Sequence, residues 1–230
     1  MLPSSTVENY LKAIHEAQHR LAGDRDLVPM GQLSSALGVV PGTATTMVKT
    51  LAESGLVVYE PYSGVRLTAA GTKLAAAVLR RHRLVELFLV RVMGMSWDEV
   101  HDEAEQMEHA VSDRLIERID EMLGRPTVDP HGDPIPDAEG LIQPPTLQQG
   151  TLLTCSVGTP LLVSRVLDQE AEFLRFVEQS NLKPGQPITV VSRDAAADRV
   201  IVRVTGDREL ALGTRAASKL LVELPAESPR

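Results

Sequence analysis

The sequence predicts a multidomain α+β chain in three parts: a helix-turn-helix with a β-hairpin, a region of long helices, and a small C-terminal β-barrel. Two short amphipathic helices joined by a glycine-bearing turn are indicated near the N-terminus. Two longer helical patterns follow, and short apolar runs with strand spacing fill the last third. The composition, 43% hydrophobic and 23% charged over 230 residues, is that of an ordinary soluble globular protein.

The N-terminal part contains the elements of a winged helix-turn-helix. Ser5 followed by Glu8 is a capping-box pattern that begins the first helix. The next two helices end at Gly38 and Gly55, because glycine commonly terminates helices. A turn with proline and glycine then separates two apolar runs, which predicts a hairpin that forms the wing. The expected helices are residues 6–21, 30–37 and 43–54, and the expected strands are residues 56–59 and 65–67.

Two long helices are expected in the middle of the chain. Thr68 caps a helix over residues 69–92. Ser96 and Glu99 form a capping box that opens a second helix, over residues 97–124. Each is too long and too apolar on one side to stand alone, so we expect them to pack together and to supply a dimer interface.

The C-terminal part is expected to be a small barrel that follows a linker. Six prolines between residues 125 and 145 break helices, which favours an interdomain linker there. Beyond it the apolar runs are short enough for strands. The expected strands are residues 152–157, 161–166, 188–192, 200–204 and 220–224, with one helix at 170–179.

Cysteine usage and hydropathy indicate a cytoplasmic location. The single cysteine, Cys155, cannot form an internal disulfide, which agrees with a reducing compartment, and its apolar neighbours favour buried packing. No apolar run approaches the length needed to span a bilayer. The first residues lack the basic and apolar regions of a secretory signal.

The charge distribution suits two different partners. The net charge of −8 argues against nucleic acid for the chain as a whole, because phosphates attract basic surfaces. Residues 1–73 nevertheless hold six basic and six acidic side chains, so the remainder carries the whole negative charge. The densest block, residues 102–139, holds twelve acids and three arginines, a pattern suited to cations. One part can therefore contact DNA weakly while another attracts metal.

A candidate metal site lies in the segment between residues 101 and 109. On a helix with about 100° per residue, His101, Glu105, Glu108 and His109 share one face within an arc of about 100°. No lysine or arginine on that face neutralises the carboxylates. The alternative interpretation is a solvated acidic face with two incidental histidines.

A second His/Glu pair favours metal over that alternative. His82 and Glu86 have i,i+4 spacing near the end of the preceding helix, and an antiparallel hairpin would bring them alongside. Together with Glu105 and Glu108, Glu86 supplies three negative charges, close to what two divalent cations need. Imidazole and carboxylate without thiolate suit manganese, iron(II), cobalt or zinc rather than copper(I).

Catalytic motifs are missing from the sequence. Three residues after Glu105 stands Glu108, so the Glu-x-x-His pairs of di-iron sites are not formed, and no His-Glu-x-x-His occurs. Neither Gly-x-Ser-x-Gly nor a phosphate-binding glycine loop is found. His15 and His19 have i,i+4 spacing that more often marks a polar face, and His131 is interpreted as a turn residue. The chain is therefore not expected to be an enzyme.

The third helix has the features of a DNA-reading helix. One face, formed by Ala44, Val48 and Leu51, should pack against the domain, and the opposite face should point outward. Hydroxyls at the start of such a helix contact bases or phosphates, although serine and threonine also merely cap and solvate helices. The helix-turn-helix and wing favour DNA contact. The candidate contact residues are Thr43, Thr45, Thr46, Lys49 and, on the wing, Arg66.

The order of these motifs resembles the DtxR-type family of iron- and manganese-dependent repressors, and in particular its manganese-responsive branch. The resemblance rests on Arg-His-Arg-Leu-x-Glu at residues 81–86, Val-His-Asp-Glu-Ala-Glu-x-x-Glu-His-Ala-x-Ser-Asp at 100–113, and Asp-Pro-Ile-Pro at 133–136. It covers residues 5–140 closely, and the expected barrel is similar to the family's SH3-like (FeoA-like) C-terminal domain. The motif at residues 100–113 is highly specific.

The resemblance implies a homodimeric repressor in which metal orders the N-terminal helix and fixes two DNA-reading domains at operator spacing. By the same resemblance His82, Glu86 and His101 are the ligands of one ion. Those of the other are Glu105, Glu108 and His109, joined by Asn9 from the first helix. Gln169 and Glu172 fall near the positions where some members add ligands from the barrel.

Three positions bear on the choice of metal. Iron-responsive members of the family carry cysteine where Glu105 stands, whereas manganese-responsive members carry a carboxylate, as here. Asn9 matches neither the methionine nor the aspartate of the two branches, although an amide oxygen is a hard donor. A further glutamate of some manganese members is Lys12 here, so their two-metal geometry need not transfer whole. Manganese is expected, two ions per subunit, with iron(II) as the alternative and zinc or cobalt as substitutes in vitro.

These inferences give a winged helix-turn-helix DNA-binding domain at residues 1–73, an α-helical dimerisation and metal-binding domain at 74–140, a linker at 141–149 and an SH3-like β-barrel at 150–230. The expected function is manganese-dependent repression of metal-uptake genes, through double-stranded operator DNA bound by a homodimer. An iron(II)-dependent repressor is the first alternative. A di-metal enzyme or metal-binding oligomer, whose helix-turn-helix is only scaffold, is the alternative from another class.

Overall fold

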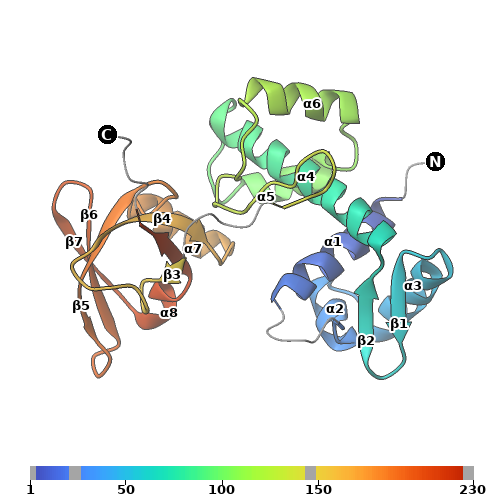
Figure 1. The fold of residues 1–230 in the computed structure, drawn as a ribbon, viewed down its shortest axis with the longest axis horizontal. Coiled ribbons are helices and arrows are strands. Elements are labelled where there is room, and N and C mark those ends of the chain that lie inside the picture. The colour runs from blue at the N-terminus through green and yellow to red at the C-terminus, as the bar shows by residue number, and fades with distance from the viewer. Residues whose placement is uncertain (1–3, 21–26, 143–148, 225–230) are drawn as a thin grey trace. The chain divides into compact units, whose positions relative to one another are not determined.

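The structure is a computed structural model and describes residues 4–20, 27–142 and 149–224 (Figure 1). The chain forms two compact units. The first combines residues 1–82, 105–116 and 136–142, and the second combines residues 83–104, 117–135 and 143–230. In the described part of the chain, no helix is both long and apolar enough to cross a membrane.

The N-terminal domain is a winged helix-turn-helix, as the sequence predicts. The largest side chains of its core include Leu11, Ile14, Leu33 and Leu51, all at most 2% exposed. The third helix begins at Pro41, two residues before the predicted start, because proline fits the first helical turn. The predicted end of the first helix at residue 21 lies outside the described residues. The elements are α1 (Ser5–Arg20), α2 (Met30–Ala36), α3 (Pro41–Glu53), β1 (Val57–Glu60) and β2 (Gly64–Leu67).

The wing is an antiparallel hairpin closed on the domain by a short bridge. Val28 pairs with Val65 through two backbone hydrogen bonds of 2.8 and 3.0 Å. Gly64 has a φ of +148°, and a Cβ there would lie 2.5 Å from the carbonyl oxygen of Val28, so this close approach requires glycine. Thr68 accepts a hydrogen bond of 3.1 Å from the backbone of Gly71 and starts the next helix, as predicted.

The helical region contains three helices where the sequence predicts two. The helix expected over residues 97–124 is wrong, because the chain leaves the helix after Met107 and enters another at Asp113. Ser112 accepts a hydrogen bond of 3.3 Å from the backbone of Leu115, so this serine caps a new helix. The elements are α4 (Ala69–Arg91), α5 (Val100–Met107) and α6 (Asp113–Met122).

The proline-rich segment is an ordered loop over residues 126–135, not the expected linker. Asp129 accepts hydrogen bonds of 2.8 and 2.9 Å from the backbone of His131 and Asp133. The Arg83 guanidinium donates to the carbonyl of Pro134. The linker proposed at residues 141–149 falls largely on residues 143–148, which lie outside the described residues.

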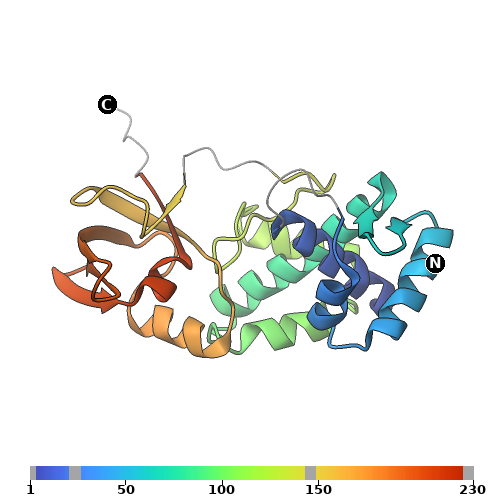
Figure 2. The same cartoon turned by 90° about the horizontal axis from the view of Figure 1, so that it is seen from below.

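The C-terminal domain is a six-stranded antiparallel sheet in the order β3-β8-β4-β5-β6-β7, with α7 packed on it (Figures 1 and 2). The strand predicted at residues 152–157 is wrong, because these residues form turns, and Cys155 is half-buried beside Arg193. Two strands, β3 and β7, fall outside the predicted ranges, because β3 has only two residues and β7 begins with two charged residues and leaves a short apolar run. The elements are β3 (Gly150–Thr151), β4 (Pro160–Val166), α7 (Ala171–Gln179), β5 (Pro187–Asp194), β6 (Arg199–Val204), β7 (Arg208–Leu212), α8 (Thr214–Ala217) and β8 (Leu220–Glu223).

The core of this sheet extends into the helical region. Trp97, 4% exposed, belongs to the same buried cluster as Leu152 and Leu174. The ordered loop also contacts the sheet, since the backbone of Val166 donates a hydrogen bond of 2.8 Å to the carbonyl of His131. Loop, tryptophan and barrel therefore pack as one unit.

Candidate metal centre and DNA-reading surface

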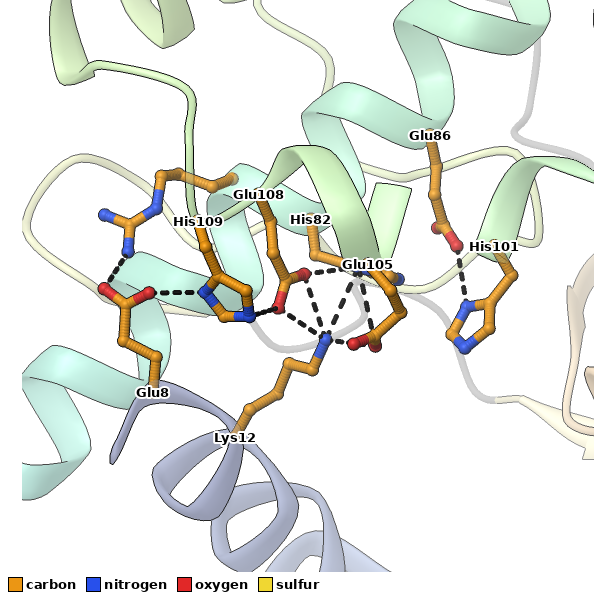
Figure 3. Close-up of polar contacts among 9 residues, drawn as sticks. Glu8, Lys12, His82, Glu86, His101, Glu105, Glu108 and His109 are labelled. Carbon is orange, nitrogen blue, oxygen red and sulfur yellow. Dashed lines mark hydrogen bonds and ion pairs between the residues drawn. The ribbon is translucent and has the colours of Figure 1, made fainter. Parts of the chain in front are cut away.

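The ammonium group of Lys12 lies in the middle of a buried carboxylate cluster. Its Nζ lies 2.9 and 3.0 Å from the two carboxylate oxygens of Glu108 and 3.5 Å from Nδ1 of His82, and it also pairs with Glu105 (Figure 3). Lys12 is 7% exposed and Glu108 is fully buried. His82 in turn lies 2.5 Å from Glu108. Helix α1, the middle of α4 and the end of α5 thus meet at one charged site.

Each charge in this cluster favours the ionised form of its neighbours. Burial alone would lower the pKa of Lys12, but the Glu108 and Glu105 carboxylates outweigh it, and the pKa is raised. Burial alone would raise the pKa of Glu108, but the hydrogen bond from His82 and the charge of Lys12 lower it. The cluster is therefore a buried ion network with anionic carboxylates.

A second residue of α1, Glu8, fixes the orientation of His109 beside the cluster. Glu8 accepts a contact of 2.6 Å from Nδ1 of His109 (Figure 3). It accepts another of 2.6 Å from the Arg81 guanidinium. The other ring nitrogen of His109, Nε2, lies 3.4 Å from Glu108. A carboxylate on one nitrogen of a histidine fixes the tautomer and directs the other nitrogen, which is the usual arrangement behind a metal-binding histidine.

The donors present fit the divalent cation that the resemblance implies. Ligand atoms of His82, Glu105 and Glu108 lie within 4.8 Å of one another. Among the described residues Oδ1 of Asn9 is buried and makes no hydrogen bond, which leaves an amide oxygen available as a ligand. Imidazole and carboxylate form the hard to intermediate donor set that manganese and iron(II) share.

The second unit holds a separate group of donors around Glu86. Its Oε1 lies 3.1 Å from Nδ1 of His101, and its Oε2 lies 3.9 Å from Nδ1 of His131. Ligand atoms of Glu86, Asp129 and His131 lie within 4.8 Å of one another, and all three residues are buried. Burial, and then the charges of Asp133 and Glu86, raise the pKa of Asp129 well above its usual range. His131 is thus a buried residue and not the simple turn residue that the sequence suggested.

Comparison with known proteins places the chain in a family. Residues 3–65 match "Iron dependent repressor, N-terminal DNA binding domain", residues 68–137 match "Iron dependent repressor, metal binding and dimerisation domain", and residues 150–224 match the FeoA domain. The iron-dependent repressor IdeR of Mycobacterium tuberculosis is 30% identical over 206 residues, which are 89% of this chain and 76% of that protein. The chain is a member of the iron-dependent repressor family.

Solved structures of similar repressors extend over nearly the whole chain. A manganese-dependent transcriptional repressor in complex with manganese is 39% identical, with a TM-score of 0.82 over 95% of this chain and 100% of the other. The manganese regulator SloR is 32% identical, with a TM-score of 0.72 over 98% of this chain and 100% of the other. The predicted fold and family are confirmed, and the similar proteins are transcriptional repressors rather than enzymes.

The DNA-reading helix of this repressor-family chain has the predicted inner and outer faces. Ala44, Val48 and Leu51 are buried, and Thr43, Thr46 and Lys49 are exposed. The hydroxyls of Thr45 and Thr46 donate hydrogen bonds of 2.8 and 3.0 Å to backbone carbonyls one turn earlier. These hydroxyls retain acceptor lone pairs for a DNA donor, and their methyl groups stay on the helix surface.

The wing and the barrel hold the remaining predicted residues. On the wing, Arg66 is half-buried in β2, while Tyr62 at the tip is fully exposed. In the barrel, Gln169 donates a hydrogen bond of 2.9 Å to Asp133, and Glu172 is exposed in the first turn of α7. Within the described residues, Gln169 and Glu172 form no hydrogen bond or ion pair with the candidate metal ligands.

Sequence reasoning does not assign five residues to the charged cluster or to the Glu86 group: Glu8, Lys12, Arg81, Asp129 and His131. The capping-box pattern accounts for Glu8 without any contact to α5, so no local pattern marks its role at the cluster. The Asp-Pro-His-Gly-Asp loop contains three potential ligands in five residues, and its prolines favoured a linker instead.

Proposed function

We propose that the chain is a manganese-activated repressor of metal-uptake genes that binds operator DNA as a homodimer. The observation that carries the metal assignment is the carboxylate at Glu105 beside Glu108, in a cluster whose other donors are imidazoles. Hard anionic oxygens suit manganese, whereas a thiolate at this position would favour softer metals. The likeness to a manganese-dependent repressor over 95% of the chain supports the same assignment.

The proposed ligands are divided between two ions per subunit. His82, Glu86 and His101 would hold one, and Asn9, Glu105, Glu108 and His109 the other. The contact between Glu86 and His101 and the i,i+4 spacing of His82 and Glu86 along α4 support the first set. The buried amide oxygen of Asn9 and the fixed tautomer of His109 support the second. When bound, a divalent cation supplies the positive charge that lets the carboxylates lie together.

Helix α1 would transmit metal binding to DNA. It carries Asn9 toward the metal centre, while Leu11 and Ile14 on its other side are fully buried in the winged-helix core. Fixing α1 to the turn at residues 108–112 therefore fixes the orientation of α3. Two recognition helices reach successive major grooves only when a dimer holds them at that spacing.

A homodimer is supported by the family match to a dimerisation domain and by exposed apolar side chains in the same region. Leu115 and Met122 of α6 are 50% and 67% exposed, and Met93 after α4 is 63% exposed. Exposed apolar side chains mark a subunit interface where they form a contiguous patch, which a dimerisation domain would supply.

Iron(II) is the second candidate activator, because the similar protein IdeR of Mycobacterium tuberculosis is an iron-dependent repressor. The deciding experiment titrates the protein's own promoter DNA by fluorescence anisotropy at fixed salt, with manganese, iron(II), cobalt or zinc. We expect tight binding only when metal is present, and we expect manganese to activate it at intracellular free concentrations. Zinc and cobalt, which bind such donors more tightly, should substitute for manganese in vitro. Activation by iron(II) but not by manganese would favour the second candidate.

The same assay tests the ligand assignment. His109→Ala should remain folded and dimeric yet lose operator binding, whereas His19→Ala, an exposed histidine of α1, should bind as the wild type does. Tight, metal-independent binding by the His109 variant would refute the coupling of metal to DNA.

A further inference from the structure

We propose that Lys12 is the resident cation of the His82–Glu105–Glu108 triad and keeps any divalent ion out of it. Removing its charge would therefore create an additional metal site in this chain. The inference rests on the proposed function only in taking the surrounding donors to be metal-binding. It concerns how many ions the subunit holds and what holds the triad together without metal.

The geometry of the ammonium group resembles that of a bound ion. Nζ of Lys12 lies 2.9 and 3.0 Å from the two oxygens of Glu108, contacts Glu105, and lies 3.5 Å from Nδ1 of His82 (Figure 3). These are the three residues whose ligand atoms lie within 4.8 Å of one another. The single ammonium nitrogen of Lys12 thus contacts all three residues of the triad.

An ammonium group and a metal ion cannot share this position. An ion ligated by all three members of the triad would need the same oxygens at about 2.1 Å, so it would lie against Nζ and meet its positive charge without an intervening ligand. The ion proposed on the His109 side of Glu108 is a different position, because its ligands do not include His82. With the lysine in place, the triad holds two carboxylates and one ammonium. An ion added to them would bring the site to a net positive charge in a buried environment.

The lysine has little freedom to withdraw. Its side chain is 9% exposed, and its neighbours on α1 include Leu11, which is fully buried, and Tyr10, which is 4% exposed. Taking Nζ into water would leave the fully buried carboxylate of Glu108 without its ammonium partner. The triad therefore has one permanent positive partner, a side chain of the protein itself, at a fixed stoichiometry that the metal supply does not change.

Metal content of the full-length dimer tests this proposal. Lys12→Met keeps the length and apolar stem of the side chain and removes the charge, and Lys73→Met removes an exposed lysine of α4 as the matched control. After equilibration with manganese and gel filtration, elemental analysis should give one more ion per subunit for Lys12→Met than for wild type and Lys73→Met. Equal metal content in all three proteins would overturn the proposal.

Stability without metal gives an independent result. The melting temperature of chelator-treated Lys12→Met should fall by about 10 °C relative to chelator-treated wild type, because two buried carboxylates lose their partner, and excess manganese should restore it. An unchanged melting temperature would contradict the role of Lys12 as resident cation.

A third measurement uses the wild type alone and applies even when Lys12→Met does not fold. Anomalous diffraction at the manganese edge, from crystals of the manganese-loaded protein, should show no peak ligated by His82, Glu105 and Glu108 together. Such a peak would overturn the inference about Lys12 and leave the proposed function standing. Absence of any manganese uptake by the wild type and its variants would instead refute the proposed function.

Discussion

At the scale of single residues, the metal preference should depend most on Glu105. This carboxylate pairs with Lys12 at the edge of the buried cluster and is the position at which a thiolate would change the donor set. We expect Glu105→Cys to weaken activation by manganese at least about tenfold and to favour cobalt or zinc. Operator binding measured against each free metal concentration checks this, and an unchanged ratio of manganese to cobalt activation would contradict it.

Glu8 should tune the same centre without being a ligand. It accepts the Nδ1 contact of His109 at 2.6 Å, and removal of such a partner typically weakens metal binding about 10- to 100-fold. Glu8→Gln is therefore expected to lower manganese affinity by that factor in calorimetric titration. Glu53→Gln, at the exposed end of α3, is the control. Equal affinities of the two variants would show that the contact has no role in metal binding.

Most of the candidate ligands can be predicted from the sequence, but their arrangement in space cannot. Histidine and glutamate at helical spacing indicated His82, Glu86, His101, Glu105, Glu108 and His109 as candidate ligands. The entry of Lys12 and Glu8 into the cluster could not be predicted, because it depends on how α1 packs against the end of α5. A lysine is ordinarily expected in water, and only tertiary contacts to buried carboxylates reverse that expectation.

At the scale of secondary structure, the break between α5 and α6 is the most informative departure from prediction. Helical periodicity placed Glu108 and His109 on the face that also holds His101, but both residues lie in the turn that follows Met107. Leaving the helix redirects their side chains, so that Glu108 faces Lys12 and His109 faces Glu8. Periodicity could not reveal this, since the residues themselves have ordinary helical propensities.

Helix α3 supports a prediction about DNA. Thr45→Ala or Lys49→Ala should weaken operator binding by about 1–3 kcal/mol for a base contact and less for a phosphate contact, and neither should change metal affinity. The Lys49 variant should also reduce the salt dependence of binding, because it removes one phosphate partner. Lys73→Ala, an exposed lysine of α4, is the matched control. Normal operator affinity in both α3 variants would mean that these side chains are only solvated.

At the scale of the whole molecule, the order of the three domains follows from sequence patterns, but the packing of the barrel does not. Strands β4, β5, β6 and β8 were predicted from apolar runs, and α7 within one residue of its start. The packing of Trp97 in the barrel core and the close approach of the ordered loop to β4 involve residues far apart in sequence. No local pattern encodes such contacts.

Gly132 should be essential for that packing. Its φ is +87°, and a Cβ there would overlap the carbonyl oxygen of Ser164 and lie 2.8 Å from Cα of Arg165. Gly132→Ala should therefore lower the free energy of unfolding by about 3 kcal/mol, from backbone strain and overlap together. Gly158→Ala, with a φ of +76° and no atom within 4 Å of its Cβ, should show the strain alone, about 1 kcal/mol. Equal effects in denaturant titrations would show that the loop can withdraw from β4.

Trp97 is the only tryptophan of the chain, and it lies at this same junction. Its ring meets the edge of His131 at a centroid distance of 4.9 Å, and the ammonium group of Lys183 lies 5.2 Å from its centroid. One indole thus touches the helical region, the ordered loop and the barrel. The protein consequently carries an intrinsic fluorescent reporter, whose emission records, without any added label, whether these three parts remain together during a titration.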